Sequence, residues 1–151
     1  MYSLITIHNT NILLSFRKKE IEEGHPVVDI RWNGTGSEFL VSSASLTPKI
    51  FNRDGLMTAE YMKGDPYILD MQHTKGHVAA ICNVSWDCDN YDRFVTASAD
   101  STVRIWDVSR KDKQMQLIKA KNQKNTRVRI TTMNTSPWES TKNMIAAACS
   151  D

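Results

Sequence analysis

Residues 76–107, GHVAAICNVSWDCDNYDRFVTASADSTVRIWD, decide the fold. The stretch opens with Gly76-His77 and closes with Trp106-Asp107, and apolar runs rich in β-branched and aromatic residues lie between them. The runs are 79–86, 93–98 and 102–108. Because polar turn formers bound each run, the pattern predicts consecutive short β-strands.

The same cycle recurs on both sides of this stretch. Trp32 and Trp86 close equivalent runs 54 residues apart, and Asp100 and Asp151 close equivalent runs 51 residues apart. The other expected strands are 3–7, 11–16, 27–32, 38–43, 49–51, 56–62, 114–120, 127–133 and 144–149. A period near 50 is slightly longer than one four-stranded propeller blade, which has about 40–45 residues. An inserted connector such as KGDPYILDMQHT accounts for the excess, and the charged RKKEIEEG is too short for a stable helix.

Gly-His at the front, Trp-Asp at the back and the turn SADSTV make residues 76–107 resemble a complete WD40 repeat. The resemblance implies an all-β fold, a WD40-type β-propeller. In that family a histidine, a hydroxyl, an aspartate and a tryptophan form a buried tetrad, which here falls on His77, Thr96, Asp100 and Trp106. The aspartate is expected to orient one imidazole nitrogen, while the hydroxyl joins the other nitrogen to the indole.

Two histidines four residues apart, His73 and His77, also suggest a metal site. The zinc-protease pattern needs a glutamate after the first histidine, and Thr74 stands there. The aspartates of WDCDNYD begin like a calcium loop, but the glycine at the sixth position of such a loop and the glutamate at its twelfth are both missing. We therefore expect no metal, no cofactor and no catalytic residue.

The flanking stretches NRDG (52–55), KGDPYILDMQHTKGH (63–77) and STVRIWDV (101–108) resemble the WD repeat-containing protein 70 group, also called gastrulation-defective-like. The resemblance covers about residues 26–151. It implies a nuclear, seven-bladed, non-catalytic propeller linked to chromatin, the DNA-damage response and ubiquitin-ligase adaptor roles.

Departures from the family pattern set the blades apart. In the earlier repeat Phe51 stands at the tryptophan, Val41 at the hydroxyl and Ser45 at the aspartate. In the last repeat Asp151 fits the aspartate, but Ala147 replaces the hydroxyl. Ubiquitin-ligase adaptors often carry Trp-Asp-x-Arg, whereas Arg110 comes one residue late in WDVSR, so that contact is not transferred.

These repeats predict five segments and about three blade equivalents. The segments are 1–26, a half blade with a charged connector; 27–63, a degenerate blade; 64–75, an inter-blade connector; 76–120, a complete blade; and 121–151, a truncated blade. Because closed propellers have about 4–8 blades, the expectation is a propeller fragment. The alternative is a complete chain whose copies close a ring together.

The net charge, the cysteines and the N-terminal stretch bear on the partners and the cellular compartment of the protein. The net charge of +2 is too small to imply nucleic acid or a membrane surface by itself. Three cysteines without a paired spacing fit a reducing compartment, and the broken apolar start lacks a basic region before it. The sequence alone predicts an intracellular protein, and the resemblance implies a nuclear one.

Two stretches are candidates for binding. The stretch from Arg110 to Arg129 contains eight Lys or Arg residues and a single acidic residue, Asp112. This excess of positive charge suggests a binding site for an acidic partner or for nucleic acid. The candidates are Arg110, Lys111, Lys113, Lys119, Lys121 and Lys124. Lysines that protect an exposed strand edge are the alternative explanation. Tyr67 in GDPYILDM is the second candidate, as an anchor for a protein partner, unless the connector simply packs over the blades. A protein-interaction scaffold is therefore expected, with a nucleic-acid-binding module as the alternative.

Overall fold

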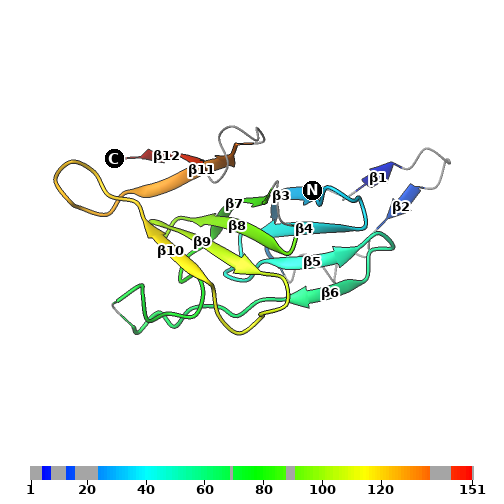
Figure 1. Ribbon diagram of the computed structural model, residues 1–151, viewed down its shortest axis with the longest axis horizontal. Coiled ribbons are helices and arrows are strands. Elements are labelled where there is room, and N and C mark those ends of the chain that lie inside the picture. The colour runs from blue at the N-terminus through cyan, green and yellow to red at the C-terminus, as the bar shows by residue number, and fades with distance from the viewer. Residues whose placement is uncertain are drawn as a thin grey trace.

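A computed structural model describes residues 5–7, 13–15, 24–68, 70–87, 91–136 and 144–150. Every regular element in these ranges is a β-strand (Figure 1). This confirms the all-β expectation. The charged stretch RKKEIEEG and Asp151 lie largely or wholly outside the described residues.

The first four-stranded sheet has the order β3-β4-β5-β6 and is antiparallel throughout. Its strands are β3 (Val27–Trp32), β4 (Glu38–Ser43), β5 (Lys49–Asn52) and β6 (Met57–Glu60). The turn between β5 and β6 carries Gly55 at φ 81°, a conformation that glycine adopts without steric cost. Below, this sheet is called the first blade.

The second sheet repeats the pattern as β7-β8-β9-β10. Its strands are β7 (Ile81–Trp86), β8 (Arg93–Ser98), β9 (Thr102–Asp107) and β10 (Gln116–Lys119). The register aligns the two blades, since Phe94 faces Trp106 as Phe39 faces Phe51. Arg104 therefore corresponds to Lys49, and Thr96 corresponds to Val41. This sheet is the second blade.

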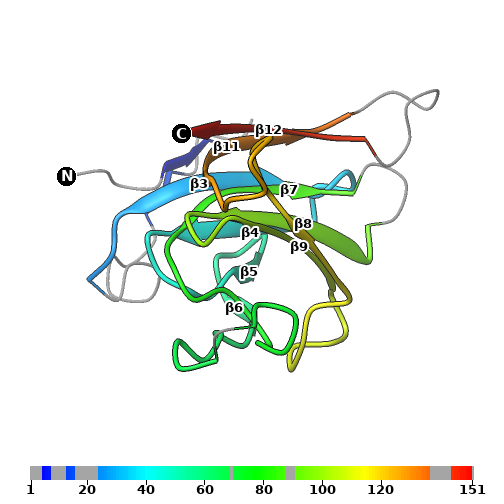
Figure 2. The same ribbon diagram turned by 90° about the vertical axis from the view of Figure 1, so that its left-hand side faces the viewer.

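Two-stranded antiparallel sheets complete the described structure: β1 (Ile5–Ile7) with β2 (Leu13–Ser15), and β11 (Arg129–Thr135) with β12 (Ile145–Ser150). The first strands of successive units, β3, β7 and β11, lie next to one another. In the turned view β11 and β12 stack over β7 (Figure 2). This serial stacking is typical of propeller blades.

The core lies between the blades. One cluster joins Leu40, Ile50 and Tyr61 of the first blade and its continuation to Phe94 and Trp106 of the second. The Tyr61 ring meets Phe94 edge-on at 4.8 Å between centroids, and its hydroxyl donates to the carbonyl of Val108 at 2.9 Å. A second cluster joins the second blade to β11. Each blade is therefore stabilised by burial against its neighbour.

Polar contacts also join the blades. The Asn83 side-chain amide donates to Asp29 Oδ2 at 2.8 Å, and the Trp86 indole N–H donates to the carbonyl of Arg31 at 2.8 Å. Trp86 is consequently 7% exposed, whereas its counterpart Trp32 is 41% exposed.

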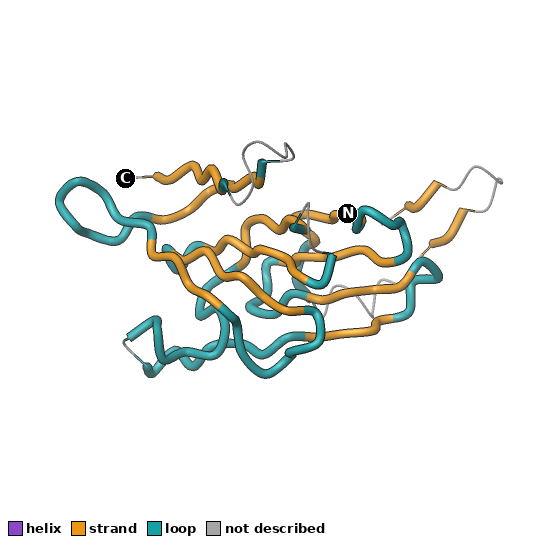
Figure 3. Tube along the Cα trace, viewed as in Figure 1, coloured by secondary structure: helices purple, strands orange, loops and turns teal. Residues whose placement is uncertain are grey.

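A long loop connects the two blades (Figure 3). It extends from the end of β6 to the start of β7 and contains the stretch GDPYILDMQHT. The loop folds against the outer part of the second blade and contributes His77 to it.

Candidate functional site

The structure brings the four tetrad side chains together in the second blade. His77 Nδ1 lies 2.9 Å from Asp100 Oδ2, and His77 Nε2 lies 2.7 Å from Thr96 Oγ1. The Trp106 indole N–H donates to the same hydroxyl oxygen at 2.8 Å. Since the carboxylate of Asp100 can only accept, the neutral His77 ring carries its proton on Nδ1, and its Nε2 accepts from the Thr96 hydroxyl.

Burial determines the protonation of this tetrad. His77 and Thr96 are fully buried, and Asp100 is 8% exposed. Burial lowers the pKa of His77 more than Asp100 raises it, so the imidazole is neutral at pH 7. Burial alone would raise the pKa of Asp100, but the hydrogen bond from His77, the charge of His77 once it is protonated, and hydrogen bonds from Thr102 and the N–H of Val78 outweigh it and lower the pKa to about 2. The pair is therefore a neutral imidazole beside a carboxylate.

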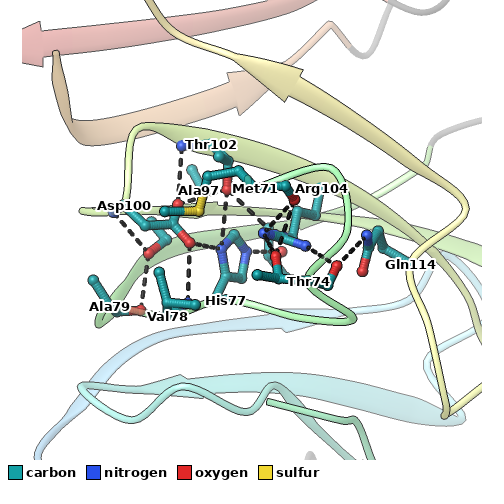
Figure 4. A network of polar contacts seen from close by, with 12 residues as sticks. Met71, Thr74, His77, Val78, Ala79, Ala97, Asp100, Thr102, Arg104 and Gln114 are labelled. Atoms are coloured by element: carbon teal, nitrogen blue, oxygen red, sulfur yellow. Dashed lines mark hydrogen bonds and ion pairs between the residues drawn. The ribbon is translucent and has the colours of Figure 1, made fainter. Parts of the chain in front are cut away.

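The network extends beyond the tetrad through a buried arginine (Figure 4). Arg104 Nε donates to Thr102 Oγ1 at 3.3 Å, and Thr102 in turn contacts Asp100. The Arg104 guanidinium also donates to Thr74 Oγ1 at 2.7 Å and to the carbonyl of Thr74 at 3.2 Å. The Gln114 amide donates to that carbonyl as well, at 2.8 Å. Arg104 thus fixes the inter-blade loop to β9.

The loop is closed at a narrow neck. The N–H of Gly64 donates to the carbonyl of His77 at 2.8 Å, so residues 65–75 form a loop whose ends meet. A Cβ at Gly64 would collide with the backbone of Gly76, and a Cβ at Gly76 would collide with the backbone of Met62. Only glycine fits at both positions. Such Ω-loops frequently carry function, and residues 65–75 are called the Ω-loop below.

The tip of the Ω-loop exposes its aromatic residue. Tyr67 is 92% exposed and Ile68 36% exposed. Asp65 fixes the turn, because its carboxylate accepts from the N–H of Tyr67 at 2.9 Å and its carbonyl accepts from the N–H of Ile68. Thr74 at the other end of the loop is fully buried. The connector therefore packs on the blade through Thr74 and leaves Tyr67 in solvent.

The basic stretch does not form one surface. Arg110, Lys111 and Lys113 lie in the β9–β10 loop, whereas Lys121 and Lys124 lie in the β10–β11 loop at the opposite end of β10 (Figure 1). The strip that is continuous in sequence is thus divided in space. Lys111 Nζ donates to the carbonyl of Thr58 on β6 at 3.0 Å, which supports an edge-protecting role for that lysine.

Lys119 contacts the Ω-loop. Its Nζ lies 3.3 Å from Asp70 Oδ1, and Asp70 Oδ2 lies 2.8 Å from His73 Nδ1. His73 is therefore a surface residue of the loop, and it does not share a site with the buried His77.

Among the described residues no three His, Cys, Asp or Glu side chains gather as a metal site requires. No helix in the same part of the chain could span a membrane. Asp89 of the calcium-like stretch lies outside the described residues.

Sequence reasoning missed Arg104 and the Gly64–Gly76 neck. A basic residue two positions before a buried tryptophan, and two glycines bracketing an inserted stretch, are the only signals the sequence carries for them.

Comparisons with known proteins agree with this geometry. The family model "WD domain, G-beta repeat" matches residues 70–107, which include the tetrad. The chain is 37% identical over 137 residues to Gastrulation defective protein 1 homolog of Drosophila melanogaster, which covers 91% of this chain and 20% of that protein. It is 37% identical over 135 residues to WD repeat-containing protein 70 of Homo sapiens, covering 89% of this chain and 20% of that protein.

A third relative is an uncharacterized WD repeat-containing protein of Schizosaccharomyces pombe, 39% identical over 83 residues, or 55% of this chain and 14% of that protein. The chain thus spans about a fifth of the length of the first two curated relatives.

Proposed function

We propose that this WD40-repeat chain, similar over nine-tenths of its length to WD repeat-containing protein 70, is part of a protein-interaction scaffold in which the Ω-loop binds the partner. WD40 repeats generally mediate protein–protein contacts, and the comparisons support that role for this chain. They are typically scaffolds rather than catalysts, so the buried tetrad serves to hold the blade.

The exposure of Tyr67 on a fixed loop carries the proposal. Tyrosine is enriched among the residues that dominate interface energies, because its ring adds large contact area at small entropic cost. An anchor on a loose loop would lose much of that gain when the loop became ordered. Arg104, Gln114 and the glycine neck order the Ω-loop before any partner arrives.

Tyr67→Ala tests the proposal. The tagged chain and its Tyr67→Ala variant are expressed in cells, and co-purified proteins are quantified by mass spectrometry. We expect specific proteins to be lost from the variant and kept by Tyr91→Ala, a matched change at a tyrosine that is 46% exposed. Identical sets of co-purified proteins for all three chains would contradict the role of the Ω-loop.

The resemblance to the WD repeat-containing protein 70 group supports a more specific setting. We propose a nuclear location, with partners among chromatin, DNA-damage or ubiquitin-ligase components. Microscopy of the tagged protein and fractionation test the location. A cytoplasmic signal would contradict the location. Enrichment of such components among the proteins that depend on Tyr67 tests the partner class, and their absence from that set would contradict it.

A further inference from the structure

The β10–β11 connection is a compact hairpin built mostly from basic and amide residues. Residues 119–129 are called the basic hairpin below. Lys121 pairs with Arg127 as an antiparallel bridge, and the N–H of Asn122 donates to the carbonyl of Thr126 at 3.0 Å. The side chain of Asn122 accepts from the N–H of Lys124 at 3.0 Å, and Asn125 adopts φ 61°. These contacts hold the turn in one shape.

Its charge is of one sign. No Asp or Glu occurs in the sequence between Asp112 and Glu139, while the hairpin carries Lys119, Lys121, Lys124, Arg127 and Arg129. All except Lys119 are exposed. Lys119 is half-buried and pairs with Asp70, whereas the other four cations are exposed on the outer part of the hairpin.

The hairpin lacks what a protein partner would need. Its apolar side chains Ala120 and Val128 are buried or half-buried, and no aromatic residue lies within it. Protein interfaces depend on buried aromatic or aliphatic anchors. Single-stranded nucleic acid is bound by aromatic stacking, which the hairpin cannot supply. Contacts to the phosphates of a duplex need only positioned cations and amide donors.

We propose that the basic hairpin binds the phosphate backbone of double-stranded nucleic acid without reading its sequence. Lys121, Lys124 and Arg127 supply about three phosphate contacts. The logarithm of the association constant should then fall against the logarithm of salt concentration with a slope of about −2.7 for duplex DNA. This binding is separate from the proposed role of the Ω-loop.

The test is fluorescence anisotropy of a labelled 20-base-pair DNA duplex titrated with the full chain at several salt concentrations. The hairpin variant is Lys121→Glu with Lys124→Glu. The control, Arg110→Glu with Lys113→Glu at the other end of β10, makes the same change in net charge. We expect the hairpin variant to bind about 10-fold or more weakly at 0.1 M salt and its slope to fall to about −1, whereas the control keeps the parent slope.

Lys121 Nζ donates to Asn125 Oδ1 at 2.7 Å, so its reversal could disturb the turn. A second variant, Lys121→Gln with Lys124→Gln, keeps a polar donor there and should show an intermediate loss. Equal weakening by hairpin and control variants would overturn the proposal, because net charge would then explain the binding. Preference for single-stranded DNA with loss on Tyr67→Ala would also overturn it, as would binding without salt dependence.

Discussion

The two blades use the same strand register, and different chemistry fills their equivalent positions. In the second blade Thr96 and Trp106 belong to a polar network that reaches His77 in the inter-blade loop. In the first blade Val41 and Phe51 occupy those positions, and Phe51 stacks on Phe39 at 5.6 Å between centroids. Ser45 stands at the aspartate position and donates to the carbonyl of Thr47 within its own turn.

The comparison shows that the propeller blade does not require the tetrad. Apolar packing forms the same four-stranded sheet, since Val41 is 2% exposed and Phe51 is fully buried. What the network adds is a connection between the sheet and the segment before it. A buried polar network fixes one arrangement, because each missing partner leaves a costly unsatisfied group. The second blade can therefore hold a shaped loop.

The largest difference between the blades is expected at the aspartate position. Asp100→Ala removes the acceptor of His77, Val78 and Thr102, and it should lower the free energy of unfolding by about 3–5 kcal/mol. Ser45→Ala should cost below about 1 kcal/mol, since the Ser45 side chain bonds only to Ser43 and to the carbonyl of Thr47 and its backbone is kept. Urea unfolding followed by tryptophan fluorescence measures both, and equal losses would show that the network adds nothing.

A reciprocal exchange of Thr96 and Val41 gives the next effect. Thr96→Val leaves His77 Nε2 and the Trp106 N–H unsatisfied, which should cost about 2–3 kcal/mol. Val41→Thr buries a hydroxyl on an apolar face and should cost about 1–2 kcal/mol. Both changes should destabilise, as measured by the urea midpoint. A stabilising Val41→Thr would mean that the first blade has a polar partner available at that position.

Arg104→Met and Lys49→Met compare the two buried cations. Arg104 holds Thr74 of the Ω-loop, so its loss should favour opening of the loop by about 2 kcal/mol, or roughly 30-fold. Trypsin cleavage at Lys63 and Lys75 should accelerate accordingly. Lys49→Met should leave loop cleavage unchanged, because Lys49 pairs across to Glu60 on β6. Equal acceleration by both variants would indicate general loosening.

The smallest expected difference between the blades is in how their stability depends on pH, and its direction is defined. Burial lowers the pKa of His77 from 6.5, so the unfolded chain takes up its proton first and stability is lost as the pH falls below about 6.5. Between pH 7 and 5.5 the loss should be about 1 kcal/mol. The carboxylate of Asp100, with its pKa lowered from 3.8 to about 2, acts in the same direction between about pH 4 and 2.

Amide hydrogen exchange resolves this effect by blade. Opening free energies in β8 should fall between pH 7 and 5.5, and those in β4 should stay constant. A parallel fall in both strands would mean that the blades unfold as one unit. His77→Gln, which does not titrate, should abolish the pH effect in β8.

The strands and turns can be predicted from the sequence because each depends on residues only a few positions apart. Alternating apolar runs and turn residues such as Asp54-Gly55 specified strands within a few positions. The residues of the tetrad followed from family resemblance, since a buried hydrogen-bond chain leaves no periodicity of its own. The same resemblance identifies Ser45, Val41 and Phe51 as departures from the tetrad pattern.

Features that depend on distant segments could not be predicted. Arg104 and Thr74 are 30 positions apart, and nothing in either stretch indicates their contact. Arg110 and Lys124 share one basic stretch of sequence, but β10 lies between them and places them at its opposite ends. The Asn83–Asp29 contact likewise depends on how the blades stack.

The glycine neck divides the inter-blade loop into a tip whose length can change and two glycine positions that cannot be substituted. Gly64 and Gly76 lie against each other. The two ends of the loop therefore join the second blade at the same places, whatever length of chain connects them. Doubling the length of a flexible loop costs only about 0.6 kcal/mol of closure entropy. New sequence inserted beside Tyr67, even a small guest domain, should be carried without disturbing the sheet. The tip apart from Tyr67 can thus change in sequence and length, whereas a methyl group at either neck glycine would collide with backbone.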